Sequence, residues 1–141
     1  MRSPGGSSEA FFTMNAETLL LRQVNPQFIQ QGRVVSLAFR PMPKDTGLLS
    51  VYDGDQIEPE AAWRHFTANL GYASSGTWAV TVAEAAALDL PAMPKPLEDF
   101  PEHAAIDFTA HDDKTQKAKA KLLAAKADTR GCLFAAPPPA A

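Results

Sequence analysis

The chain has 141 residues, 45% of them apolar and 21% charged, with a formal net charge of −3. This composition is typical of one soluble globular domain. No apolar run approaches the roughly 20 residues of a membrane-spanning helix, no secretion signal is recognisable, and the single cysteine, Cys132, excludes an internal disulfide. We therefore expect a cytoplasmic protein with neither a metal nor a cofactor.

In chain order, hydrophobic periodicity and turn residues predict strands at 19–24, 33–39 and 48–52, a helix at 59–70, a strand at 76–82, a short helix at 83–88, a strand at 103–108, a long helix at 112–130 and a short last strand at 132–134. This order, βββαβαβαβ, favours an α+β fold with a mostly antiparallel sheet of about five strands and two or three helices. We expect one domain over 18–134, an extended Pro-rich connector at 91–101, and disordered ends at 1–17 and 135–141.

The two longer helices have recognisable ends and faces. Pro59 suits the first position of a helix, and Gly71 suits its end. Asp112 precedes the long helix and Gly131 follows it, as the helix dipole and the cap preferences favour. The faces expected to be buried are Ala62, Trp63, Phe66 and Leu70 in the first helix, and Thr115, Ala118, Leu122, Ala125 and Thr129 in the second.

Charge is sorted along the chain into three segments. Residues 1–50 contain five Lys or Arg and three Asp or Glu, residues 51–113 contain two and twelve, and residues 114–141 contain six and one. An acidic middle segment repels itself unless it meets the basic ends or an outside partner. The pattern therefore indicates association, either within the fold or with another molecule.

The acidic surplus around 53–60 carries our first functional hypothesis. Acidic side chains beside a helix start would steer a basic partner, so we predict an accessory, adaptor or immunity-type module that binds another protein. The residues expected to contact the partner are Asp53, Asp55, Glu58, Glu60 and Arg64. A calcium loop is not expected here, because Ile57 and Arg64 stand where its template requires oxygen ligands.

The basic residues of the first segment support a second hypothesis, an enzyme or sensor for a phosphorylated or nucleotide ligand. The candidate ligand-binding cations are Arg22, Arg33, Arg40 and Lys44. If the first strands pair, several of these cations would converge on a phosphate. His65 or His103 would act as a base, and Asp107 would share a strand face with His103 and orient its imidazole. Alternatively, the cations neutralise the acidic segment inside the fold.

A short stretch also resembles a known family. Leu-Leu-Arg ending at Arg22, followed by Ser36 on the next predicted strand, resembles the beginning of ADP-ribosyltransferase-like enzymes. The resemblance is confined to these two strands and implies an Arg on an early strand, a Ser on another and a late Glu. Arg22 and Ser36 are then catalytic candidates, and Glu84 and Glu102 are available for the third role.

Other functional classes are disfavoured. The lysines of the long helix flank its predicted apolar stripe on both sides, as snorkelling side chains do. A chain with net charge −3 and an acidic centre is a poor partner for nucleic acid. The sequence also lacks a P-loop, a G-x-G-x-x-G and a G-x-S-x-G motif. Binding is therefore favoured over catalysis.

Overall fold

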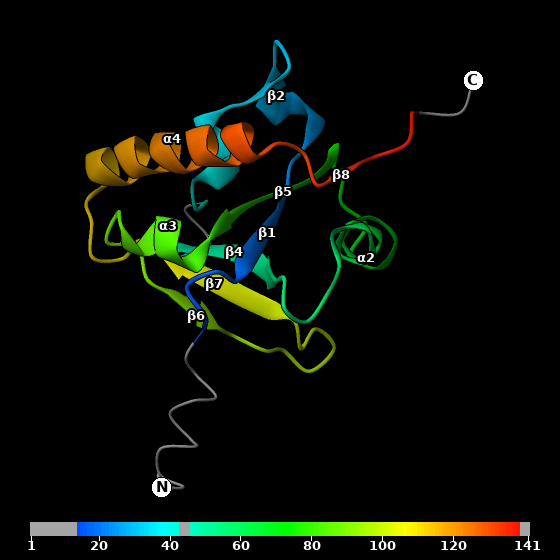
Figure 1. Ribbon diagram of the computed structural model, residues 1–141, viewed down its shortest axis with the longest axis horizontal. Coiled ribbons are helices and arrows are strands. Elements are labelled where there is room, and N and C mark those ends of the chain that lie inside the picture. The colour runs from blue at the N-terminus through cyan, green and yellow to red at the C-terminus, as the bar shows by residue number, and fades with distance from the viewer. Residues whose placement is uncertain (1–13, 43–45, 139–141) are drawn as a thin grey trace, which may run out of the picture.

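The computed structural model describes residues 14–42 and 46–138. Within these residues, six strands form one antiparallel sheet in the order β6-β7-β4-β1-β5-β8 (Figure 1). The strands of this sheet are β1 (Leu19–Gln23), β4 (Leu48–Asp53), β5 (Gly76–Thr81), β6 (Ala92–Pro94), β7 (His103–Asp107) and β8 (Phe134–Ala135). A separate hairpin consists of β2 (Ile29–Gln30) and β3 (Arg33–Val34). The predicted α+β class and the antiparallel sheet are confirmed.

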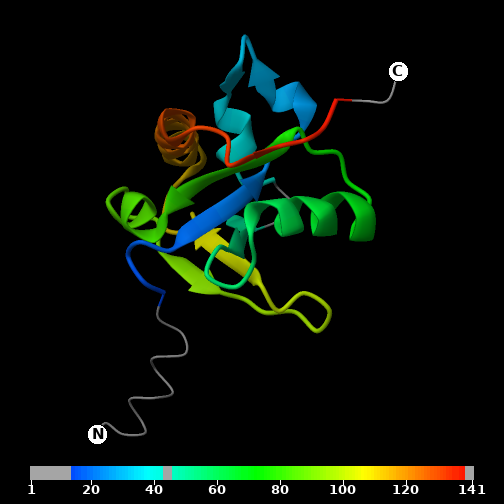
Figure 2. The ribbon, with the colours of Figure 1, turned by 45° about the vertical axis from the view of Figure 1, so that its right-hand side comes forward.

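Three α-helices accompany the sheet in the described residues: α2 (Pro59–Arg64), α3 (Val82–Ala86) and α4 (Asp113–Arg130). α2 continues into a π-helical segment, η4 (His65–Asn69), and two short 3-10 helices are η1 (Pro26–Phe28) and η2 (Ser36–Phe39). Figure 2 shows α2 and α4 with β1 between them. Successive strand residues point to opposite faces. Leu20 accordingly belongs to the core beside α4, and Leu21 to a second cluster beside α2.

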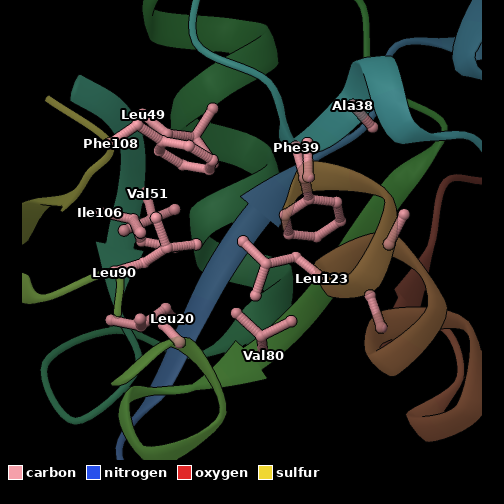
Figure 3. Close-up of a cluster of buried hydrophobic side chains, with 14 of the residues drawn as sticks. Leu20, Ala38, Phe39, Leu49, Val51, Val80, Leu90, Ile106, Phe108 and Leu123 are labelled. Carbon is pink, nitrogen blue, oxygen red and sulfur yellow. The ribbon is translucent and has the colours of Figure 1, made fainter. Parts of the chain in front are cut away.

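The main core fills the space between the sheet and α4 (Figure 3). Its fully buried members include Leu20, Val80 and Ile106 from the sheet, Phe39 from η2 and Leu123 from α4. Burying each such side chain contributes about 1.5–3 kcal/mol. The second cluster is smaller and more aromatic. It contains Leu21, Tyr52, Ala62 and Ala79, with Ile57, Phe66 and Phe100 among the residues packed against it.

The strand predicted at 33–39 is wrong after its second residue. β3 ends at Val34, and Ser36–Phe39 forms the 3-10 helix η2. Ala38 and Phe39 are neighbours in sequence, and both are buried in the core beside α4. A strand would have turned these adjacent side chains to opposite faces, whereas a helical turn directs both toward the core.

The long helix confirms its predicted ends but not its predicted face. The Asp112 side chain accepts a hydrogen bond from Thr115 N at 2.8 Å, and Gly131 ends the helix at φ +93°. The buried residues are Ala120, Leu123, Ala124 and Ala127. Leu122 is 50% exposed. The helix is rich in alanine and has two adjacent leucines, so its apolar pattern fits two faces, and contact with η2 and β5 selects one of them.

The boundaries of the sheet differ in detail from the prediction. β6 lies inside the predicted Pro-rich connector, where it forms an edge strand beside β7. Proline is tolerated at a sheet edge because no neighbour needs its missing N–H group. The described chain already contacts the domain before residue 18: Met14 packs against the main core, and the Ala16 carbonyl accepts a hydrogen bond from Ala83 N. Residues 1–13 and 139–141 lie outside the described part of the chain.

The centre of the sheet is paired along only part of its length. β1 pairs with β4 at Leu20↔Asp53 and Leu21↔Tyr52, whereas its ladder with β5 continues to Gln23. β4 in turn pairs with β7 back to Leu48. In the described structure β1 and β4 therefore separate after Leu21 in β1 and before Tyr52 in β4, and the sheet is open between them at this end.

Candidate functional site

A pocket of about 300 Å³ lies where β1 and β4 separate, on the face of the sheet that carries α2 and η4. Four aromatic residues line it: Tyr52 from β4, Phe66 from η4, and Tyr72 and Phe100 from loops. The rings form two pairs, Tyr52 with Phe100 at 4.7 Å and Phe66 with Tyr72 at 5.2 Å between centroids. These separations are typical of favourable aromatic contacts. The walls are therefore built from these two ring pairs together with the aliphatic side chains of Leu21, Val51, Leu70 and Leu97.

One polar group of the pocket occupies the opening in the sheet. The Arg22 guanidinium donates from Nε to the Ala38 carbonyl at 2.7 Å and from Nη1 to the Ser50 carbonyl at 2.8 Å. Arg22 and Ser50 both line the pocket. A side chain thus joins β1 to β4 where the two strands have separated.

His103 forms the adjoining wall, and both of its ring nitrogens have partners. Nδ1 lies 2.8 Å from the Lys95 carbonyl, and Nε2 lies 3.1 Å from Ser50 Oγ. A carbonyl can only accept, so Nδ1 carries a proton, and in the neutral ring Nε2 accepts from the Ser50 hydroxyl. Ser50 thereby connects Arg22 with His103, which are two of the catalytic candidates predicted from the sequence.

A second histidine, His65, contacts two of the aromatic residues that line the pocket. His65 Nδ1 lies 2.8 Å from the Tyr52 hydroxyl, and the His65 ring lies 4.5 Å from that of Phe100. Burial, followed by the negative charge of Glu102, raises the pKa of the Tyr52 phenol above its usual value. The phenol therefore stays protonated near neutral pH, and the His65 tautomer sets which of the two groups donates the hydrogen bond. The interaction fixes the Tyr52 ring against the pocket.

A buried polar network holds the far end of β1. Gln23 donates from Nε2 to Thr77 Oγ1 at 2.8 Å and accepts from Ser74 Oγ at 2.8 Å, and Thr77 donates to the Pro59 carbonyl at 3.0 Å. These contacts connect β1, β5 and the start of α2. Because this network is buried, it stabilises the part of the pocket wall that Gln23 forms.

The acidic loop at 53–60, which we predicted as the contact surface, lies next to this pocket. Asp53 is only 8% exposed, and its carboxylate accepts hydrogen bonds from Asp55 N and from Gln56 Nε2. Asp53 therefore closes the turn after β4 and leaves little surface for a partner to contact. Asp55 accepts from the Thr18 hydroxyl at 2.6 Å, whereas Glu58 is exposed and its side chain does not cap α2. Glu60 and Arg64 form an exposed ion pair with each other.

A second acidic loop, at 97–102, also lies beside the pocket. The tight turn from Leu97 to Phe100 contains the exposed residues Glu98 and Asp99, and both ends of this turn line the pocket. The Glu102 carbonyl accepts a hydrogen bond from Asp53 N at 2.9 Å, which ties this loop to the end of β4. Two acidic loops that are distant in sequence therefore meet beside the aromatic pocket.

Two further predicted cations that the structure describes, Arg33 and Arg40, do not lie at this pocket. Arg40 pairs with Asp113 at 2.7 Å at the start of α4, and Arg33 lines a shallow hollow between the β2–β3 hairpin and α4. Lys44 lies outside the described residues. Of the three candidate ligand cations that the structure describes, only Arg22 lines the pocket. Arg40 instead neutralises an acidic residue, as the alternative reading of these cations proposed.

Two catalytic candidates also lie away from the pocket. Asp107 accepts hydrogen bonds from Thr109 N and Oγ1 and pairs with Leu48, at the opposite end of β7 from His103. Four residues along a strand span about 13 Å, so Asp107 does not orient that imidazole. Ser36 begins η2 rather than lying on a strand, and it lines the same hollow as Arg33. Arg22 and Ser36, which carried the family resemblance, therefore face different cavities.

Sequence reasoning missed the aromatic lining itself. Tyr72 follows Gly71, and Phe100 precedes Pro101, so both lie in segments that the sequence already marked as loops. A large aromatic side chain in a loop outside any apolar period is the available signal, because no helix or strand of its own accounts for its presence. Leu70, which was assigned to the core face of the helix, is 41% exposed and lines the pocket.

No group of three or more His, Cys, Asp or Glu side chains in the described residues is placed to hold a metal ion. None of the helices in residues 14–42 and 46–138 has the length and apolar character needed to cross a membrane. Comparison with family models, curated proteins and solved structures found no match for the chain.

Proposed function

We propose that this protein is a cytoplasmic accessory module that binds another protein, and that a basic segment of the partner docks on the face formed by α2, η4 and the loop at 97–102. One observation carries the proposal. An aromatic pocket with an exposed apolar rim lies beside two acidic loops. Leu70, Tyr72 and Leu97 are 41%, 57% and 53% exposed at that rim. Apolar rim residues of this size in a polar surround are typical of interaction sites.

Charge supports a basic partner. The two loops and the start of α2 contribute Asp55, Glu58, Glu60, Glu98, Asp99 and Glu102, and the cations in the same stretches are Arg64 and Lys95. Arg64 is already paired with Glu60. The remaining negative charge attracts a cationic segment and repels phosphate. It also accelerates encounter with a basic partner in a manner that weakens with salt.

The contacts of the two candidate bases hold the walls of the pocket in place. In the neutral state, His103 uses both ring nitrogens on Lys95 and Ser50, and His65 Nδ1 is hydrogen-bonded to the Tyr52 hydroxyl. The histidines beside this pocket therefore act as supports for its walls.

Selection from a random peptide display library on the full chain tests the proposal. Peptides recovered with the wild-type protein should be enriched in Lys and Arg, and their binding should weaken in high salt. Asp99→Lys should weaken binding, because Asp99 lies in the turn whose ends line the pocket. Glu17→Lys makes the same charge change at an exposed position before β1 and serves as the control. Recovery of neutral or acidic peptides, or equal loss in both variants, would contradict the proposal.

A further inference from the structure

We infer that the aromatic pocket receives one large aromatic side chain of the basic partner segment, so that the recognised motif is an aromatic residue flanked by Lys or Arg. This inference rests on the proposed function and specifies its ligand. The two parts of the motif correspond to two features that lie side by side. These features are the ring-lined pocket and the acidic loops at 53–60 and 97–102.

The dimensions of the pocket favour a single side chain. Its volume of about 300 Å³ is at the lower end of the range for cavities that enclose drug-sized ligands. A nucleotide would also have to place its phosphates beside Glu98, Asp99 and Glu102. The nearest lining cation, Arg22, already donates to the carbonyls of Ala38 and Ser50. An uncharged ring meets neither obstacle.

The lining fits an aromatic ring better than a flexible aliphatic chain. Tyr52 and Phe100 form one wall, and Phe66 and Tyr72 belong to another ring pair. An inserted ring would make offset or edge-to-face contacts with these walls. Aromatic anchors also lose little conformational entropy on binding, which is one reason they dominate the energetics of protein interfaces.

Neighbouring basic side chains would then reach the acidic loops. In the sequence, Glu98 and Asp99 lie between two residues that line the pocket, Leu97 and Phe100. The two carboxylates are therefore close to the neighbours of any side chain that occupies the pocket. Glu58 lies at the start of α2, on the loop whose Ile57 packs with Phe100 in the same cluster. An aromatic anchor with cations on both sides therefore meets opposite charges in both directions.

The experiment compares two labelled peptides of equal charge, Lys-Lys-Ser-Trp-Ser-Lys-Lys and the same peptide with Ala in place of Trp, by fluorescence anisotropy with the full chain. We expect the Trp peptide to bind about 10-fold or more tightly than the Ala peptide. Leu97→Ala and Tyr72→Ala should each remove most of that difference, and Leu97→Met should retain it. Leu122→Ala is the matched control, since Leu122 is 50% exposed on α4, outside this pocket.

The outcomes separate the inference from the proposed function. If both peptides bind equally well, the anchor is wrong while a basic partner remains supported. If neither peptide binds, both proposals fail. If the free protein sediments as a dimer and Leu97→Ala makes it monomeric, the pocket holds a second copy of this chain and the inference is overturned. Displacement of the Trp peptide by AMP would overturn it in favour of a nucleotide.

Discussion

Replacement of Arg130 by methionine should destabilise the fold far more than replacement of any exposed cation. Arg130 ends α4, and its Nη1 donates to the Ala79 carbonyl on β5 at 3.1 Å and to Glu84 Oε1 at 2.8 Å, while Nη2 donates to Glu84 Oε2 at 3.0 Å. Glu84 also accepts from Thr81 N and so closes the capping box of α3. One guanidinium therefore joins α4, β5 and α3.

The expected loss is about 2 kcal/mol in the free energy of unfolding. The two side chains are 26% and 24% exposed, so the pair lies between exposed pairs, worth about 0.2–1 kcal/mol, and buried pairs, whose disruption costs about 3–5 kcal/mol. Met keeps most of the aliphatic packing of Arg130. The variant therefore reports mainly the lost hydrogen bonds and the orphaned Ala79 carbonyl and Glu84 carboxylate.

Urea unfolding of the wild type, Arg130→Met and Arg64→Met measures this difference. Arg64 forms an exposed pair with Glu60, so its replacement should change stability by less than about 0.5 kcal/mol. If the two variants lost equal stability, the importance assigned to the Arg130 contacts would be refuted.

The pH dependence of this effect has a definite sign. The hydrogen bonds from Arg130 hold the pKa of Glu84 below its usual value, against the opposing effect of burial. A lowered folded-state pKa adds stability that is complete above the unfolded-state pKa, about 4.3, and is lost as the pH falls through the folded-state pKa. The gap between wild type and Arg130→Met should therefore be full at pH 7 and shrink in acid. A gap that stayed constant down to pH 2 would contradict the ionised pair.

Three further predictions test the core, the buried network and the thiol. Leu123→Ala should lower the free energy of unfolding, measured in urea, by about 2–5 kcal/mol, and Leu122→Ala by less than about 0.5 kcal/mol. The reverse order would contradict the assignment of Leu123 to the buried face of α4. Thr77→Val should cost about 1–3 kcal/mol by leaving the Gln23 amide unpaired, and an unchanged urea midpoint would contradict this bond. Burial raises the pKa of Cys132, so it should react with iodoacetamide at pH 7 more slowly than cysteine in the urea-unfolded chain, and an equal rate would count against that shift.

Local sequence signals determined the parts of the fold whose causes are themselves local. Asp112 and Gly131 set the ends of the long helix because capping depends on a few adjacent backbone groups. The strands at β1, β4, β5 and β7 follow apolar and β-branched runs bounded by turn residues. The antiparallel α+β class followed from the order of these elements.

Tertiary contacts decided what local patterns left ambiguous. η2 forms where a strand was predicted, because Ala38 and Phe39 must both face α4. Leu123 rather than Leu122 is buried because packing against η2 and β5 selects one face of an alanine-rich helix. In both places the local conformational preferences for the two alternatives differ by less than the free energy gained by burying an apolar side chain, so packing determines which alternative forms.

The candidate site belongs almost wholly to the tertiary structure. The sequence showed an acidic middle segment and predicted its densest part, 53–60, as the contact surface. It also contained Arg22 and His103 without bringing them together. The pocket exists because β1 and β4 separate and because two different loops each supply an aromatic wall residue, Tyr72 and Phe100. Convergence of side chains across long sequence separations depends on sheet order and register, which no local period encodes.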